Sequence, residues 1–188
     1  MVSLIKDDVI QAWYMDNSDM DQRLPHHRTP NEFVPLEKLK ELGVLTWRLD
    51  ADNYENDEEL KEIRKARGYN HMEVYDINPE KFSKYLETIE ALYQEHFHTF
   101  EEVSFCISGS GYYDVRDCDE SWIRISLKKG AMIILPAGIY HRSTTDSNDF
   151  FKIMILHSDD FISTPYNRSN EHLPERKQYI DTFVKKIN

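Results

Sequence analysis

The second half of the chain alternates between short apolar runs and small polar breaks. Turn-forming stretches separate these runs, among them Gly109-Ser110-Gly111, Lys128 to Gly130 and Pro136-Ala137-Gly138. Runs of this length, rich in Ile, Val, Tyr and Phe, are typical of β-strands. The pattern predicts strands near residues 103–108, 111–117, 122–127, 131–135, 139–145 and 150–157. Many short strands joined by turns favour an all-β sandwich or barrel.

Before residue 94 the apolar residues mostly follow the spacing of helices. A short strand is predicted at 11–15, followed by a polar loop at 16–33 in which His26 and His27 are expected to be solvated. Apolar residues three or four apart, flanked by capping residues, predict helices. The predicted helices are 36–42 ended by Gly43, a segment from Asn56 to Gly68, 79–93 with Asn78 as its cap, and about 174–187.

Size and charge narrow the class of protein. A chain of 188 residues has the size of one domain. We expect an N-terminal strand and helices over about 1–93, a barrel core over about 94–165, and the C-terminal helix after it. The formal net charge of −11, without a basic cluster, argues against a nucleic acid or an anionic membrane as partner. No apolar run is long enough to span a membrane.

The N-terminal residues and the cysteines bear on location. The first ten residues include Lys6, Asp7 and Asp8 and lack the apolar core of a signal peptide. Two cysteines, Cys106 and Cys118, are too few for a disulfide framework. We therefore expect a cytoplasmic protein. Helices at both ends could cover the edges of the barrel, which favours a monomer.

One segment carries the residues of a metal site, His96-Phe97-His98 followed by Glu102. Side chains on an extended strand alternate with a period of two, so these three would point to the same face. Two imidazoles and a carboxylate with open positions suit non-haem Fe(II), and they also accept Ni, Co, Mn or Zn. A lone His-x-His pair more often lies on the surface and binds no metal. The spacing of the surrounding residues therefore decides whether this pair is a metal site.

The spacing around these residues resembles the two motifs of the cupin superfamily. The first reads His-x-His-x3-Glu-x6-Gly and ends at Gly109, and the second reads Gly-x5-Pro-x-Gly-x2-His, from Gly130 to His141. In cupins the two motifs lie on neighbouring strands of a double-stranded β-helix, or jelly-roll barrel, and their ligands converge inside it. The resemblance implies this mainly β fold with peripheral α-helices, and makes His141 the fourth metal ligand.

The resemblance to one cupin family extends over nearly the whole chain after residue 10. The segments that look like acireductone dioxygenase are Ala12 to Asp16, Leu49 to Asp52, Tyr54 to Asp57, Glu95 to His98, Gly109 to Asp117, Trp122 to Arg124, Leu135 to Arg142 and Tyr166 to Arg168.

This resemblance implies a specific activity. Acireductone dioxygenases of methionine salvage use Fe(II) and O2 to oxidise 1,2-dihydroxy-5-(methylthio)pent-1-en-3-one to formate and 4-methylthio-2-oxobutanoate. With Ni(II) the same fold gives another product set, which includes carbon monoxide. The implied partners are a small-molecule enediol and O2, and we expect Glu102 and His141 to be catalytic residues as well as ligands. Animal members also occur in the nucleus, so a nuclear location joins the cytoplasmic one.

Four positions depart from the family's pattern. Two arginines are replaced by Ser104 and Ile155, a phenylalanine by Ser143, and a tryptophan by Ser163. Ser104 and Ser143 share strand parity with the ligands, so together with Ile155 they form the predicted substrate pocket. A buried cation would stabilise an anionic enediolate, and its loss leaves two hypotheses open. Under the first hypothesis, Lys152 or a water network compensates for the lost arginines and acireductone activity is kept. Under the second, the chain is a divergent paralogue. Such a paralogue would act on another substrate or serve as a non-catalytic binding protein.

Overall fold

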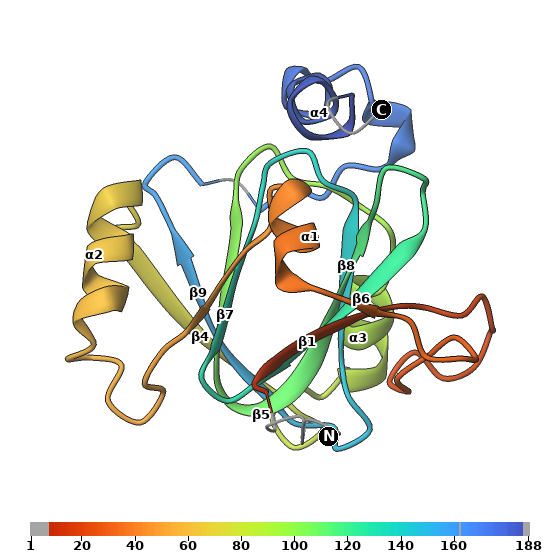
Figure 1. Cartoon of the computed structure of the whole chain (residues 1–188). Coiled ribbons are helices and arrows are strands. Elements are labelled where there is room, and N and C mark those ends of the chain that lie inside the picture. Colours follow the sequence, from red (N-terminus) through yellow and green to blue (C-terminus); the bar gives the residue numbers. More distant parts are fainter. Residues whose placement is uncertain (1–7, 162, 186–188) are drawn as a thin grey trace, which may run out of the picture.

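The chain folds around a barrel of antiparallel strands, with helices on its outside (Figure 1). The computed structural model describes residues 8–161 and 163–185. This arrangement confirms the mainly β barrel predicted from the sequence. The strands among the described residues are β1 Ile10–Tyr14, β2 Phe33–Val34, β3 Leu45–Arg48, β4 His71–Ile77, β5 Glu102–Arg116, β6 Trp122–Lys128, β7 Ala131–Leu135, β8 His141–Thr145 and β9 Phe151–His157.

Strand β5 belongs to both hydrogen-bonded sheets of the barrel. Its first half pairs with β7 and β9, and its second half pairs with β6 and β8. The change falls at Gly109, whose φ is +74° and where an added Cβ would lie 2.0 Å from the Phe150 carbonyl oxygen. Only glycine tolerates both the left-handed backbone and this close approach. The predicted turn at Gly109-Ser110-Gly111 is therefore wrong, because the glycines bend one strand instead of reversing the chain.

The helices cover the barrel from outside. Helices α1 (Leu36–Glu41) and α3 (Tyr85–Leu92) contribute Leu39, Tyr85 and Ile89 to the main core, where they pack with apolar side chains of the strands. Helix α2 packs Leu60 and Ile63 into a second core on the outer face of the sheet formed by β7, β5 and β9. The helices are α1 Leu36–Glu41, α2 Glu58–Arg67, α3 Tyr85–Leu92, a 3-10 turn Arg168–Asn170, and α4 Pro174–Tyr179, which continues into a π-helical segment Ile180–Val184. The predicted end of the last helix near residue 187 lies outside the described residues.

Two predicted helix starts are corrected by the structure. Asp57, and not Asn56, caps α2, because its carboxylate accepts the Leu60 amide at 2.8 Å. Asn78 does accept backbone amides, but it closes a turn, and α3 begins only at Tyr85.

The sequence prediction also missed β2, β3 and β4. Strand β4 pairs with β9 along its whole length, from His71 opposite His157 to Ile77 opposite Phe151. His71 is thus the first residue of this strand. The first five residues of β4 are exposed, so the strand lacks the apolar alternation by which a half-buried strand is recognised.

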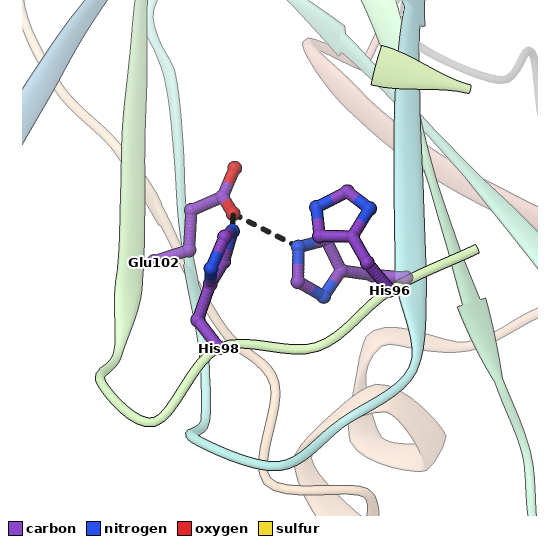
Figure 2. Close-up of side chains that lie close together, drawn as sticks. His96, His98 and Glu102 are labelled. Atoms are coloured by element: carbon purple, nitrogen blue, oxygen red, sulfur yellow. Dashed lines mark hydrogen bonds and ion pairs between the residues drawn. The ribbon is translucent and has the colours of Figure 1, made fainter. Parts of the chain in front are cut away.

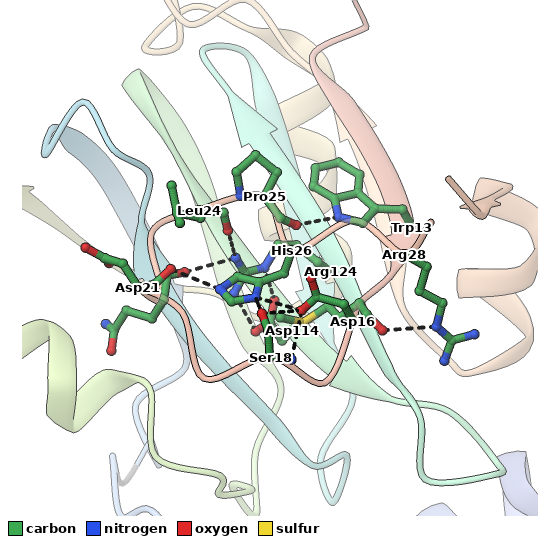
Figure 3. A network of polar contacts seen from close by, with 12 residues as sticks. Trp13, Asp16, Ser18, Asp21, Leu24, Pro25, His26, Arg28, Asp114 and Arg124 are labelled. Atoms are coloured by element: carbon green, nitrogen blue, oxygen red, sulfur yellow. Dashed lines mark hydrogen bonds and ion pairs between the residues drawn. The ribbon is translucent and has the colours of Figure 1, made fainter. Parts of the chain in front are cut away.

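The loop after β1 is fastened to the barrel by a buried arginine (Figure 3). Arg124 on β6 is fully buried and donates to both carboxylate oxygens of Asp114, at 2.7 and 2.9 Å, and to the carbonyls of Gln22 and Leu24. His26, predicted to be solvated, is buried between Asp16 and the Asp21 carbonyl. The polar loop is therefore an ordered part of the fold, because the barrel supplies partners for its backbone.

Among the described residues, no helix has the length and apolar character that crossing a bilayer requires.

Candidate metal centre and cavity

Four side chains from three segments converge at one end of the barrel. His96 and His98 lie in the extended segment before β5, Glu102 opens β5, and His141 opens β8. Their ligand atoms all lie within 4.8 Å of one another. Figure 2 shows His98 and Glu102 turned toward each other, with the His96 ring close by. The structure thus brings together the four residues that the two motifs singled out.

The backbone explains how distant segments meet. His96 and His141 form an isolated antiparallel bridge, with amide–carbonyl distances of 3.1 and 2.9 Å. The expected common strand for His96, His98 and Glu102 is wrong, because the chain bends at 99–100 before β5 begins. Glu102 still reaches the histidines, since the bend returns the chain beneath them.

Each imidazole is oriented by a backbone carbonyl. The Nδ1 atoms of His96, His98 and His141 lie 2.7, 2.8 and 3.0 Å from the carbonyls of Gln94, Thr164 and Ile139. A carbonyl only accepts, so each Nδ1 carries the proton and each Nε2 keeps its lone pair. This arrangement fixes the tautomer that a metal-binding histidine needs.

The free nitrogen atoms face a carboxylate. His141 Nε2 lies 2.9 Å and His98 Nε2 3.3 Å from the same oxygen of Glu102. Lone pairs on nitrogen and oxygen would repel at these distances unless a proton or a cation lies between them. Three imidazoles and one carboxylate therefore fit a divalent transition metal.

The charge states at the site suit the same purpose. Burial alone would raise the pKa of Glu102, but the charges and hydrogen bonds of His141 and His98 hold it well below its ordinary value. Burial, together with the neighbouring His141, lowers the pKa of His96 to about 4. Burial would also lower the pKa of His98, yet the facing Glu102 carboxylate favours the protonated ring and raises it. Glu102 is thus anionic and His96 neutral at neutral pH.

Three of the four residues, His96, His98 and Glu102, line a cavity of about 1100 Å³, and His141 is buried behind them. Strands β4 and β9 form one wall, with Ile153 and Ile155 on β9, and α3 forms another. Among the described residues, no lysine or arginine lines this cavity, whereas Glu73, Glu95 and Glu102 do. A ligand in the cavity therefore meets no fixed cation from the described side chains.

The predicted pocket residues divide into two groups. Ser143 and Ile155 line the cavity, and so does Ser163. Ser104 was also predicted to line the pocket, but its side chain is fully buried and is not part of the cavity wall. Its hydroxyl lies 2.5 Å from the phenol of Tyr113, which lines the cavity in its place.

Tyr113 is a polar cavity residue, close to Glu102, that the sequence analysis did not predict. Counting with a period of two from Glu102 and Ser104 places Tyr113 on the opposite face of β5. The register shifts between Cys106 and Ser108, and this irregularity reverses the parity of the second half of the strand. Gly109 in the motif was the only sequence signal of such a change.

Arg142, the neighbour of His141 in the sequence, does not line the cavity. Its guanidinium donates to Asp114 at 2.9 Å and lies 3.9 Å from the centre of the Tyr93 ring. It therefore adds no positive charge to the cavity.

Comparison with known proteins places this geometry in a family. The model of the ARD/ARD' family matches residues 11–165. The chain belongs to the ARD/ARD' family. It is 58% identical over 180 residues to acireductone dioxygenase 3 of Arabidopsis thaliana, which covers 96% of this chain and 90% of the relative. It is also 58% identical to acireductone dioxygenase 2 of Vitis vinifera, over 96% of this chain and 91% of the relative.

A solved structure supports the fold of this ARD/ARD' family member. The structure described as acireductone dioxygenase from Bacillus anthracis with a cadmium ion in the active centre superposes with a TM-score of 0.66, at 18% identity. The match covers 85% of this chain and 99% of the bacterial one. The likeness confirms the cupin-type barrel expected from the two motifs.

Proposed function

We propose that this chain is an acireductone dioxygenase of methionine salvage. It would oxidise 1,2-dihydroxy-5-(methylthio)pent-1-en-3-one with O2 to formate and 4-methylthio-2-oxobutanoate. The observation that carries the proposal is the cluster of Glu102 with three imidazoles, each with its Nδ1 held by a backbone carbonyl so that its Nε2 is left for a metal. The names and high identity of the plant relatives support the same reaction.

We propose Fe(II) as the resident metal, with Ni(II) as the alternative. Three nitrogen donors and one carboxylate oxygen accept both ions, so metal availability decides between them. His96, His98, Glu102 and His141 would be the ligands. When bound, the metal supplies Lewis acidity and a template for a deprotonated enediol.

The chain's own residues provide orientation and a partly dry cavity. Glu102 and His141, the proposed catalytic residues, would hold the charge and geometry of the centre through their 2.9 Å contact. The apolar side chains Ile153 and Ile155 cover the wall next to the metal site and reduce access of water to it. His96 stays neutral above about pH 4 and so remains available as a ligand.

The test is single-turnover chemistry. The protein is loaded anaerobically with Fe(II), mixed with the enediol, and exposed to O2, and formate is measured. We expect one formate for each loaded site. The His98→Ala variant should lose metal and formate together. A wild-type protein with a fully occupied metal site and no formate would reject the proposal.

A second candidate function is a divergent oxygenase or a binding protein with the same metal site. The observation that favours it is the cavity wall, where the described residues offer Ser143, Ile155 and Ser163 but no lysine or arginine. Oxygen uptake with another enediol, without formate from acireductone, would favour another substrate. Partner binding that persists in His98→Ala would favour a role independent of the metal.

We further propose a single-domain monomer in the cytoplasm, with a nuclear pool. Cys106 and Cys118 are both free, as expected in a reducing compartment. Light scattering of the purified protein tests the oligomeric state, and imaging of a tagged chain tests the location.

A further inference from the structure

Tyr113 places a hydroxyl group beside the candidate metal centre. Its side chain is buried, yet it lines the cavity together with Glu102. Across the sheets it lies opposite Ser143 on β8 and Ile125 on β6. A phenol is protonated at neutral pH, so Tyr113 is a neutral hydrogen-bond donor at this position.

Ser104 orients this phenol. The two oxygen atoms are 2.5 Å apart, and Tyr113 is the hydrogen-bond partner that the described residues offer to the Ser104 hydroxyl. If Tyr113 donated to Ser104, the serine proton would be buried without an acceptor, which is unfavourable. Ser104 therefore donates to the phenol oxygen, and the phenol proton is left for an acceptor on the side of Glu102 and the cavity.

The charges of the cavity show what such a donor is for. An enediolate is anionic, and the described lining residues include carboxylates but neither lysine nor arginine. Apart from a metal, its oxygen atoms must be stabilised by neutral donors. Tyr113 is buried, held by a second hydroxyl and next to a metal-ligand carboxylate, so it is preorganised for this contact.

We propose that Tyr113, oriented by Ser104, is a specificity-determining residue whose phenol donates a hydrogen bond to an oxygen of the metal-chelating enediolate, in the place of a cationic side chain. This assignment rests on the proposed function, since the ligand is the substrate of that reaction. Ser104 acts through Tyr113 and is a positioning residue.

The test compares Tyr113→Phe and Ser104→Ala with the wild type in two measurements. The first is metal content and thermal stability after loading with Fe(II). The second is anaerobic titration with 1,2-dihydroxy-5-(methylthio)pent-1-en-3-one, followed through the absorbance of the bound enediolate, and then KM and kcat under O2. Tyr112→Phe is the matched control, because Tyr112 is the next residue on β5 and does not line the cavity.

We expect Tyr113→Phe to bind the enediol roughly 10- to 100-fold more weakly, as for a lost hydrogen bond to a charged group. KM should rise by a similar factor, metal content should stay the same, and Ser104→Ala should show a smaller loss. Tyr112→Phe should bind like the wild type.

Three results would overturn the assignment. If Tyr113→Phe binds the enediol as tightly as the wild type, the phenol does not contact the substrate. If Tyr113→Phe instead loses metal, the phenol serves Glu102 and not the enediol. If the loaded wild type binds no enediol, both the proposed function and this assignment fail. The first two results would reject only the role of Tyr113 and leave the proposed function standing.

Discussion

At the scale of single residues, Glu102 decides whether the centre binds a metal. It is the one anionic donor of the four, and it faces both His98 and His141. Changing Glu102 to Gln keeps the shape but removes the charge that balances a divalent cation. We expect at least a roughly 100-fold loss of metal affinity, beyond the usual effect of changing an outer partner of a ligand. Metal analysis after dialysis against a defined Fe(II) concentration measures it.

Glu101→Gln is the control for that change. Glu101 is adjacent in sequence, but its carboxylate contacts Arg67 and Tyr69 on the far side of the strand. The control should keep its metal. If both variants lost metal affinity equally, the total negative charge of the segment, and not the position of Glu102, would govern metal binding.

The interaction of Asp21 with Arg23 stabilises the loop after β1, and this stabilisation depends on pH. Hydrogen bonds from Arg23 lower the pKa of Asp21 from 3.8 to about 2. Because the pKa is depressed in the folded state, the stabilisation is complete above the unfolded pKa and is lost as the pH falls toward 2. The gain is small, since the Asp21 side chain is 44% exposed. We expect the difference in unfolding free energy between the wild type and Asp21→Asn to be constant above about pH 5 and to shrink below pH 4. Urea unfolding across this range tests it, and a difference that grows in acid would contradict the assignment.

At the scale of elements, the bend in β5 depends on Gly109. Alanine there would need a left-handed backbone and would meet the Phe150 carbonyl. Strained backbone costs about 1–3 kcal/mol, and the collision adds to it. We expect Gly109→Ala to lower the unfolding free energy by about 3 kcal/mol or more. Gly68→Ala is the control, since Gly68 has a similar φ of +70° and open space around it, so it isolates the backbone part. Equal losses in a denaturant titration would rule out the collision.

The same strand shows what the sequence could and could not predict. Strands β6 and β7 were predicted close to their real bounds because most of their residues are apolar and buried, and this pattern is visible within the strand itself. The bend in β5 was mistaken for a turn, because glycine pairs serve both purposes. Strand β4 was missed, since its inner face lines an open cavity and carries Glu73 and Tyr75 instead of core residues.

The candidate site divides along similar lines. The four donors were predictable because side-chain chemistry and spacing are written in the sequence. The carbonyls of Gln94, Thr164 and Ile139 that orient the histidines were not, because a backbone carbonyl is the same for every residue type. Tyr113 was missed because one register shift reverses the parity of all the residues that follow it.

At the scale of the whole molecule, a bound metal would join the segment before β5 to β5 and β8. A ligand that binds only the folded state adds stability, by about 2.7 kcal/mol at a hundredfold excess over its dissociation constant. For a domain of this size we expect chelation to lower Tm by about 5–10 °C. Scanning fluorimetry with and without chelator measures the shift. Glu102→Gln should show almost none, and an equal shift in that variant would place the chelated metal elsewhere.

Strand β5 is hydrogen-bonded in both sheets. If one sheet opens, the other sheet still holds part of β5 in place. Its amide hydrogens should therefore exchange with solvent only when the entire barrel unfolds. Edge strands such as β4, which pairs with β9 alone, should exchange earlier through partial opening. The slowest amides would then belong to the strand that carries Glu102 and Tyr113. Partial opening of the edge strands would let small molecules enter and leave the cavity, while the strand that carries Glu102 and Tyr113 keeps its structure.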